Sequence, residues 1–160
     1  AKKQYQKIYL AGFSLGGALV LIHSALYNDV DKIIAVSTPA DFGKIENQMW
    51  KKEAWLPTLK KYEPARWFSV RPSLYSLVIS SKIKPIDIIK YVKAPTLFIA
   101  GKKDPTVHLW HTDKLYKEAV CEKQLELFDS THAEDLYLDE PEKFMNICVN
   151  WLHPLPNPSP

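Results

Sequence analysis

Four short runs of apolar residues recur along the chain, each rich in β-branched or aromatic side chains and bounded by glycine, proline or polar positions. Runs of this length and composition predict buried parallel strands. Longer segments of helical character lie between and after them. The strands are predicted at residues 7–13, 32–37, 96–101 and 124–128, and helices at residues 17–27, 110–120 and 141–152. This alternation predicts an α/β fold with a parallel sheet of about four strands and flanking helices.

The segment between the second and third predicted strands, residues 41–93, is too long for a simple crossover and contains several prolines. Because proline interrupts helices, we expect only short helices, at residues 44–54, 58–62, 73–80 and 85–91. Large aromatic side chains are frequent here, and they either line an apolar pocket or pack the segment onto the core. These aromatic residues are Trp50, Trp55, Tyr62, Trp67, Phe68 and Tyr75.

A serine between two glycines, in Gly12-Phe13-Ser14-Leu15-Gly16, stands at the junction of the first predicted strand and the first predicted helix. This pattern at a strand-to-helix turn is the nucleophile elbow. Such a turn is too tight for bulky side chains, which explains the glycines at both flanks. It lifts the serine hydroxyl above the sheet, at the positive end of a helix. On its own the pattern is a weak signal, because a glycine-rich turn also contains a serine by chance.

Two further polar residues follow the third and fourth predicted strands. Asp104 stands just beyond the third strand, where the active-site residues of an open α/β sheet gather, although an Asp-Pro turn or a helix N-cap would also place an aspartate there. His132 lies in the loop after the fourth strand and, taken alone, would be an ordinary surface histidine. The order Ser14, Asp104, His132 is the order of a serine nucleophile, its acid and its base in one class of hydrolases. Together the three predict a catalytic triad.

Three stretches of the chain resemble the motifs of serine hydrolases with the α/β-hydrolase fold, and most closely those of the esterase, monoacylglycerol lipase and serine aminopeptidase group. The stretches are residues 12–17, 94–104 and 130–134, and the resemblance extends over about residues 7–152. It implies Ser14 as the nucleophile, His132 as the general base and Asp104 as the acid that orients the base. It also implies the backbone N–H of Leu15 as one oxyanion donor, with Gly12 and Gly16 forming the elbow.

The resemblance also bears on the residues that follow the second predicted strand. Asp41 is a second candidate for the acid, because some relatives carry the acid at that place, but the loop of Asp104 resembles the family pattern more closely. An insertion at about residues 42–93 would form a helical cap over the active site. Basic residues outnumber acidic ones in this insertion. The positive charge either attracts anionic substrates or an anionic lipid surface, or it reflects only exposed lysines on short helices.

Hydrolases of this family carry four or five strands before the elbow, whereas here the elbow strand is predicted to begin at residue 7. By resemblance, the four predicted strands are the last four of an eight-stranded sheet, so we expect the C-terminal half of the fold. The second oxyanion donor comes from a loop before the elbow, and the elbow strand would have an unpaired edge. We therefore expect a piece of a longer hydrolase, a partner that supplies the missing N-terminal half, or a homodimer formed through the exposed strand edge.

Composition restricts the classes of function. The net charge of +3 is mild, and no run approaches the roughly 20 apolar residues of a membrane span, so we expect no nucleic-acid partner and no transmembrane segment. Cys121 and Cys148 fit the reduced thiols of a cytoplasmic protein, with a single disulfide as the alternative. His108 and His111 are expected to be solvated, so we expect no metal and no cofactor. Residues 1–153 are expected to form one domain, followed by a mobile proline-rich tail at residues 154–160.

The leading hypothesis is a serine hydrolase that cleaves a small-molecule ester or other acyl substrate through an acyl-enzyme intermediate. A peptidase or amidase with the same triad is an alternative, because the same histidine would protonate an amine leaving group. A non-catalytic fragment or interaction module is a further alternative, since the second oxyanion donor is missing from the predicted elements.

Overall fold

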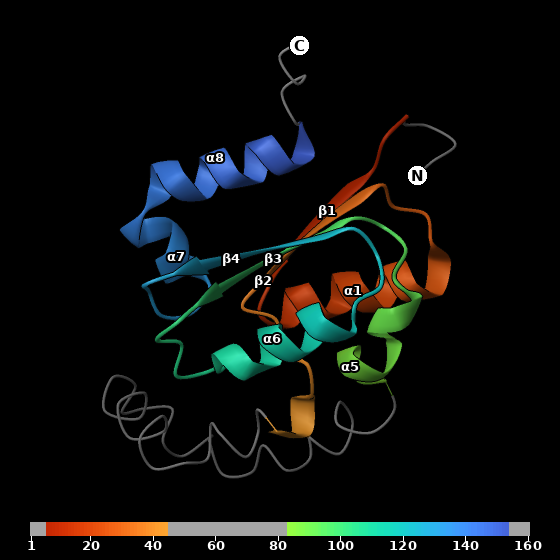
Figure 1. Ribbon diagram of the computed structural model, residues 1–160, viewed down its shortest axis with the longest axis horizontal. Coiled ribbons are helices and arrows are strands. Elements are labelled where there is room, and N and C mark those ends of the chain that lie inside the picture. The colour runs from red at the N-terminus through yellow and green to blue at the C-terminus, as the bar shows by residue number, and fades with distance from the viewer. Residues whose placement is uncertain (1–5, 45–82, 154–160) are drawn as a thin grey trace, which may run out of the picture.

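A parallel sheet of four strands forms the centre of the protein in its computed structural model (Figure 1). The structure describes residues 6–44 and 83–153. The strands are β1 (Tyr9–Phe13), β2 (Lys32–Val36), β3 (Thr96–Gly101) and β4 (Lys123–Phe128). They lie in the order β1-β2-β3-β4, and each neighbouring pair is parallel. The four predicted strands are therefore confirmed, with ends that differ by no more than two residues.

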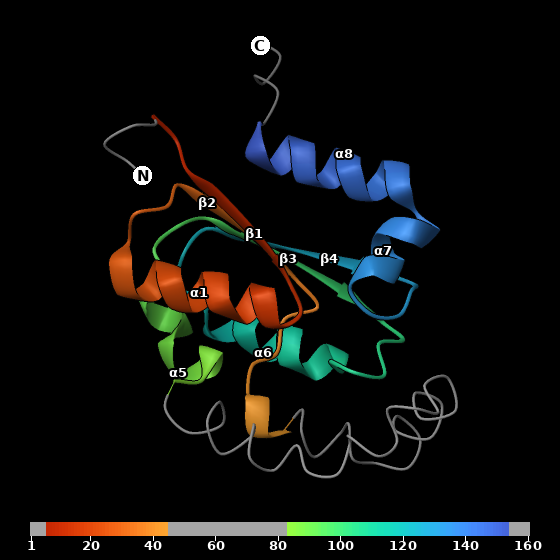
Figure 2. The same ribbon diagram turned by 180° about the vertical axis from the view of Figure 1, so that it is seen from behind.

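Helices cover both faces of the sheet (Figures 1 and 2). One layer contains α1 (Leu15–Tyr27), α5 (Pro85–Ile88) with the short 3-10 helix η2 (Ile89–Tyr91), and α6 (Leu109–Glu118). The other layer contains α7 (Glu134–Asp139) and α8 (Pro141–Leu152). The helices predicted at residues 17–27, 85–91, 110–120 and 141–152 are confirmed as α1, α5 with η2, α6 and α8. The short helix α7 was not expected, because its six residues are too few to show a helical period.

Strand β2 shows why its residues are apolar on both faces. Ile33 and Ala35 belong to the core cluster that also includes Leu21 of α1. Their neighbours Ile34 and Val36 belong to the second cluster, which includes residues of α7 and α8. Because side chains alternate between the faces of a strand, a strand covered by helices on both sides needs an uninterrupted apolar run.

The end of the predicted insertion packs into the core. Ile89 and Val92 are fully buried in the same cluster as Ile33 and Phe98. Residues 85–92 therefore belong to the helical layer beside α1, although the sequence assigned them to the cap. Residues 45–82 of the insertion, which include the six aromatic residues named above and the helices predicted at residues 58–62 and 73–80, lie outside the described residues, as does the predicted tail at residues 154–160.

The parallel arrangement brings four loops to one edge of the sheet. Because all four strands run in the same direction, the segments that follow them begin at the same side. These segments start with Ser14 after β1, Ser37 after β2, Lys102 after β3 and Asp129 after β4. All of the residues proposed for chemistry lie in or next to them.

Candidate active site

Ser14 occupies a strained turn between β1 and α1. Its backbone has a φ of 49° and a ψ of −118°, a conformation that costs an L-residue free energy and persists only where the surrounding structure enforces it. The Ser14 N–H donates a hydrogen bond to the carbonyl oxygen of Val36 at 2.8 Å, which ties the turn to the end of β2. The side chain forms no capping hydrogen bond to α1, so the helix does not sequester the hydroxyl group.

The glycines around the turn have unequal roles. A Cβ atom at Gly12 would lie 2.3 Å from the carbonyl oxygen of Gly16, and a Cβ atom at Gly17 would lie 2.0 Å from Oγ1 of Thr38. A Cβ atom at Gly16 would meet nothing within 4 Å. The expected crowding is thus confirmed at Gly12 and wrong at Gly16, because the helix approaches the end of β2 one residue later, at Gly17.

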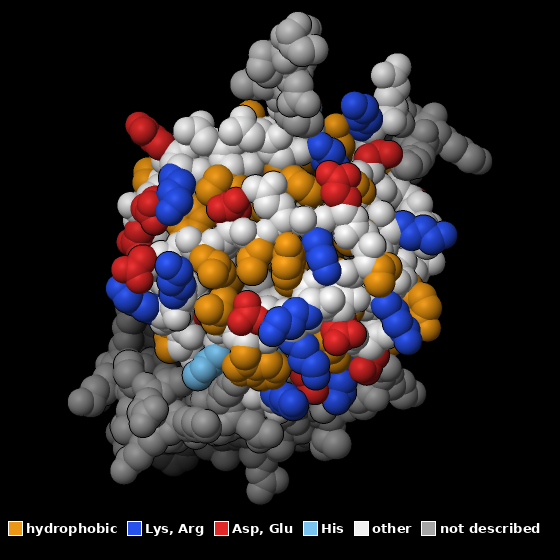
Figure 3. Space-filling view, in the orientation of Figure 1, with side chains coloured by type: hydrophobic (Ala, Val, Ile, Leu, Met, Phe, Trp, Pro, Cys, Tyr) orange, Lys and Arg blue, Asp and Glu red, His pale blue; other side chains and the backbone are white. Residues whose placement is uncertain are grey.

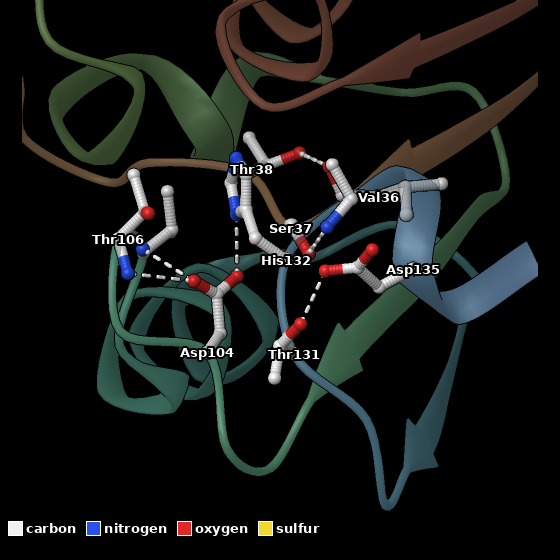
Figure 4. A network of polar contacts seen from close by, with 10 residues as sticks. Val36, Ser37, Thr38, Asp104, Thr106, Thr131, His132 and Asp135 are labelled. Atoms are coloured by element: carbon white, nitrogen blue, oxygen red, sulfur yellow. Dashed lines mark hydrogen bonds and ion pairs between the residues drawn. The ribbon is translucent and has the colours of Figure 1, made fainter. Parts of the chain in front are cut away.

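Asp104 and His132 form a hydrogen-bonded pair (Figure 4). The Nδ1 atom of His132 lies 2.6 Å from Oδ2 of Asp104. The other carboxylate oxygen accepts the backbone N–H groups of Thr106 and Val107, each at 2.8 Å. Because a carboxylate only accepts hydrogen bonds, Nδ1 of His132 is the donor of this pair, and Nε2 is the ring nitrogen left for another partner. Asp104 is 5% exposed, so the acid is shielded from water while the histidine side chain remains partly accessible.

The loop that carries His132 crosses back over the sheet from β4 towards β2. The backbone N–H of Ala133 donates a hydrogen bond to Oγ of Ser37 at 3.1 Å, and Ser37 directly follows β2. Within the loop, the hydroxyl of Thr131 donates to the carboxylate of Asp135 (Figure 4). The loop therefore lies against β2, the strand that also holds the turn at Ser14.

The structure brings together two of the three predicted catalytic side chains. Ser14 lies at the same edge of the sheet as Asp104 and His132, but the hydrogen bonds among the described residues include none between the hydroxyl of Ser14 and His132. Hydrogen bonds of this kind are often long in unliganded enzymes and shorten only with bound substrate. The pairing of Asp104 with His132 is thus observed, and the role of Ser14 is a proposal.

Asp41, the other candidate acid, pairs with a different residue. Its carboxylate accepts a hydrogen bond from Nζ of Lys84 at 3.1 Å and from the backbone N–H of Gly43 at 3.0 Å. Burial acts to raise the pKa of Asp41, but the hydrogen bond and charge of Lys84 outweigh it and hold the pKa below its usual range. The contacts of Asp41 therefore orient it towards Lys84, and those of Asp104 orient it towards His132.

The expectation that His111 is solvated is wrong. His111 is completely buried, whereas His108 is exposed as expected. The Nδ1 atom of His111 accepts the backbone N–H of Ala40 at 3.1 Å. Burial is the main reason that its pKa falls to about 4, so the ring is neutral at physiological pH. Where the chain is described, no group of three or more His, Cys, Asp or Glu side chains is arranged to hold a metal ion.

Both cysteines are free thiols in the structure. Burial raises the pKa of the Cys148 thiol to about 11, so this side chain is not a nucleophile near neutral pH. Among the described residues, no helix is long and apolar enough to cross a membrane.

Sequence reasoning missed Ser37 and Gly17. Ser37 bonds to a residue 96 positions away in the chain, and no local pattern signals such a contact. Gly17 had a signal, since it extends the Gly-x-Ser-x-Gly pattern by one small residue.

The four parallel strands, the two helical layers and the strained turn after β1 define the fold of the α/β hydrolases, here as a partial sheet. Comparison with solved structures supports this assignment of the fold. No family model matches the sequence, and no curated protein matches it.

Solved structures similar to this chain include esterases and other hydrolases. An esterase of Pyrococcus furiosus is 22% identical with a TM-score of 0.70, and the match covers 94% of this chain and 55% of that one. An esterase of Exiguobacterium antarcticum is 22% identical with a TM-score of 0.62, over 89% of this chain and 65% of that one. A meta-cleavage product hydrolase of Pseudomonas fluorescens is 19% identical with a TM-score of 0.59, over 91% of this chain and 64% of that one. The chain thus spans between about half and two thirds of the length of these relatives.

Proposed function

We propose that this chain carries the catalytic triad of a serine hydrolase that cleaves carboxylic esters. The nucleophile is Ser14, the general base is His132 and the orienting acid is Asp104. The observation that carries the proposal is the 2.6 Å hydrogen bond from His132 to a buried carboxylate, at the edge of the sheet where a serine stands in a strained turn. The esterases among the similar structures support an ester as the substrate class.

The proposed reaction proceeds in two stages. The hydroxyl proton of Ser14 moves to Nε2 of His132 while Oγ bonds to the acyl carbon of the ester. The carbon–oxygen bond to the alcohol then breaks, and the alcohol leaves with the proton from His132, which gives an acyl-enzyme. In the second stage His132 takes a proton from a water molecule whose oxygen bonds to the acyl carbon. The bond from that carbon to Oγ of Ser14 then breaks, the proton passes from His132 to Oγ, and the carboxylic acid is released. Asp104 fixes the tautomer of the imidazole and stabilises its cation.

The N-terminus of α1 supplies one donor to the oxyanion of this reaction. The helix begins at Leu15, and the N–H groups of a first helical turn have no partner within the helix. Among the hydrogen bonds between described backbone groups outside regular elements, none uses the N–H of Leu15. This group is therefore free to bind a negatively charged oxygen, which the positive end of the helix also favours.

A second donor and a neighbour for β1 would come from outside the described elements. β1 pairs with β2 alone among the described strands. Helices α1 and α8, which lie on opposite faces of the sheet (Figure 2), carry exposed apolar side chains, Leu19 and Leu26 on α1 and Met145 and Val149 on α8. Such an edge favours the addition of further strands. We therefore propose that an N-terminal half of the fold or a second copy of this chain pairs with β1.

The charge distribution agrees with a small-molecule substrate. The net charge is only +3, and on the face that Figure 3 shows, basic and acidic side chains are interspersed. A surface of this kind does not provide the single-sign field that draws in nucleic acid.

The test is covalent labelling of the chain by a fluorophosphonate, followed by intact mass and peptide mapping. We expect one adduct, located on Ser14 and absent from the Ser14→Ala variant. Ser24→Ala is the matched control, because Ser24 is a buried serine of α1 whose hydroxyl has no hydrogen-bond partner, and it should be labelled normally. A folded chain that takes no adduct would show that it acts, by itself, as a non-catalytic module. A panel of esters and aminoacyl amides of equal size then separates an esterase from a peptidase or amidase.

A further inference from the structure

Ser37, the residue that follows β2, is a buried polar side chain whose partner is remote in the sequence. It is 1% exposed, and its backbone has a φ of 45°, which is uncommon for a residue other than glycine. Its N–H donates to the carbonyl oxygen of Ile99 at 2.8 Å, so the backbone extends the pairing of β2 with β3. The hydroxyl is thereby directed to the loop after β4, where it accepts the N–H of Ala133 at 3.1 Å (Figure 4).

Ala133 directly follows His132 and is itself strained. Its φ is 46° and its ψ is −98°, close to the conformation of Ser14. A backbone in this region persists only when its surroundings hold it there. The N–H of Asp135 donates to the carbonyl oxygen of His132 at 3.0 Å, which closes a tight turn around Ala133. The hydrogen bond from Ala133 to Ser37 ties this turn to the end of β2.

His132 is consequently held at two points. Asp104 holds the imidazole ring through Nδ1, and Ser37 holds the backbone next to the residue. The carbonyl oxygen of Val36, one residue before Ser37, accepts the N–H of Ser14 at 2.8 Å. Two consecutive residues at the end of β2 therefore fix the turn of the serine on one side and the turn of the histidine on the other.

We propose that Ser37 is a positioning residue, whose hydroxyl sets the distance between the imidazole of His132 and the hydroxyl of Ser14. This inference rests on the proposed function of the same site. Within the described part of the chain, Ser37 forms no hydrogen bond to Ser14 or to the ring of His132, so it acts through the backbone of the loop. Small displacements of catalytic groups are costly, and an error of about 1 Å slows a reaction by up to about 10²-fold.

The experiment compares Ser37→Ala and Ser37→Gly with Ser24→Ala. Both Ser37 variants lack the hydroxyl. Glycine also tolerates the positive φ at this position, so Ser37→Gly should keep the fold even if alanine strains the backbone there. Ser24→Ala removes another buried serine hydroxyl, one without a partner. We expect fluorophosphonate labelling of both Ser37 variants to be slower than that of Ser24→Ala by about tenfold or more. Labelling rates within about threefold of Ser24→Ala would overturn the proposal and leave the proposed function intact.

A second readout does not depend on the nucleophile. The proton between His132 and Asp104 should give a low-field proton NMR signal, assigned by its loss in Asp104→Asn. We expect this signal to weaken by exchange in both Ser37 variants and to persist in Ser24→Ala. If the unmodified chain takes no fluorophosphonate, the proposed function fails for this chain, and the NMR signal still decides the role of Ser37. A signal of equal strength in all three variants would overturn the positioning role of Ser37.

Discussion

At the scale of single residues, the identity of the acid decides how His132 is oriented. Asp104 accepts Nδ1 of His132 and two backbone N–H groups, whereas Asp41 accepts Lys84. Both aspartates are buried, but they have different partners. Substitution of each one therefore separates the effect of the partner from the effect of burial.

Asp104→Asn should reduce the rate of fluorophosphonate labelling on the order of 10⁴-fold, because an amide no longer selects the tautomer with its proton on Nδ1. The measurement is the pseudo-first-order rate constant for adduct formation on Ser14. Asp41→Asn is the control and should stay close to the unmodified rate. Equal losses in the two variants would mean that burial of a carboxylate, rather than its contact with His132, matters for reactivity.

His111 should make the fold sensitive to acid. Its pKa is about 4 in the folded chain and near 6.5 in an unfolded one. The folded state binds the proton less readily than the unfolded state. The free energy of unfolding is therefore highest above pH 6.5, where the ring is neutral in both states, and it declines as the pH falls towards 4. The complete decline would amount to roughly 3 kcal/mol. The free energy of unfolding, measured by urea titration between pH 7 and pH 4, should therefore decline less in His111→Gln than in the unmodified chain.

The exposed His108 provides the comparison for this experiment. His108→Gln removes an exposed histidine and should change the pH dependence of the unmodified chain less than His111→Gln does. If His111→Gln also retained that dependence, the loss of stability in acid would have to come from other groups.

At the scale of elements, the junction of β1 and α1 makes unequal demands on its glycines. Gly12→Ala places a Cβ atom 2.3 Å from a backbone oxygen, so the helix or the strand must shift. We expect a loss of about 1–3 kcal/mol in the free energy of unfolding together with slower labelling of Ser14. Gly16→Ala meets open space and should be neutral or slightly stabilising, because alanine favours helices over glycine. Thermal unfolding of both variants measures the difference, and equal losses would contradict it.

The four strands and the longer helices followed from the sequence, because buried parallel strands need uninterrupted apolar runs, as at residues 96–101, whereas the short helix α7 did not. Individual contacts between residues far apart in the chain could not be predicted from the sequence. His111 is buried and accepts the N–H of Ala40, which lies 71 residues away in the chain, and nothing near His111 in the sequence indicates that contact. The same holds for Ser37, whose partner belongs to the last loop of the site. The order Ser14, Asp104, His132 did predict which side chains gather at one edge, since parallel strands end there.

At the scale of the whole molecule, we expect association at the side of β1 that has no neighbour among the described strands. The N–H groups of Ile8 and Ser14 point towards β2 and its loops, so by alternation the N–H groups of Tyr9, Ala11 and Phe13 point outwards. Ala11 is exposed, and it lies at the middle of this free edge. Any strand that adds to the sheet here must accept the Ala11 N–H.

Ala11→Pro removes that donor without removing a bond to β2, and proline is tolerated where its missing N–H would face outwards. If copies of the chain pair through β1, this variant should associate at least about fivefold more weakly, the equivalent of one hydrogen bond of about 1 kcal/mol. The measurement is the concentration dependence of the molar mass by light scattering, with Ala11→Val as the control that keeps the N–H. A monomeric unmodified chain at all concentrations would contradict pairing of copies through this edge.

The convergence of two distant turns on the end of β2 has a consequence for the order of events during folding. The turn at Ser14 is encoded near the start of the chain and the turn at Ala133 near its end, and each becomes fixed only when it meets Val36 or Ser37. Contacts so far apart in sequence close slowly, because chain entropy must be lost before they form. A partly folded chain with β1, β2 and β3 already paired would hold Ser14 in its turn without a histidine beside it. Reactivity at Ser14 would therefore arise as one of the last events of folding. During synthesis, the Ser14 hydroxyl would remain unreactive until the loop after β4 has been made.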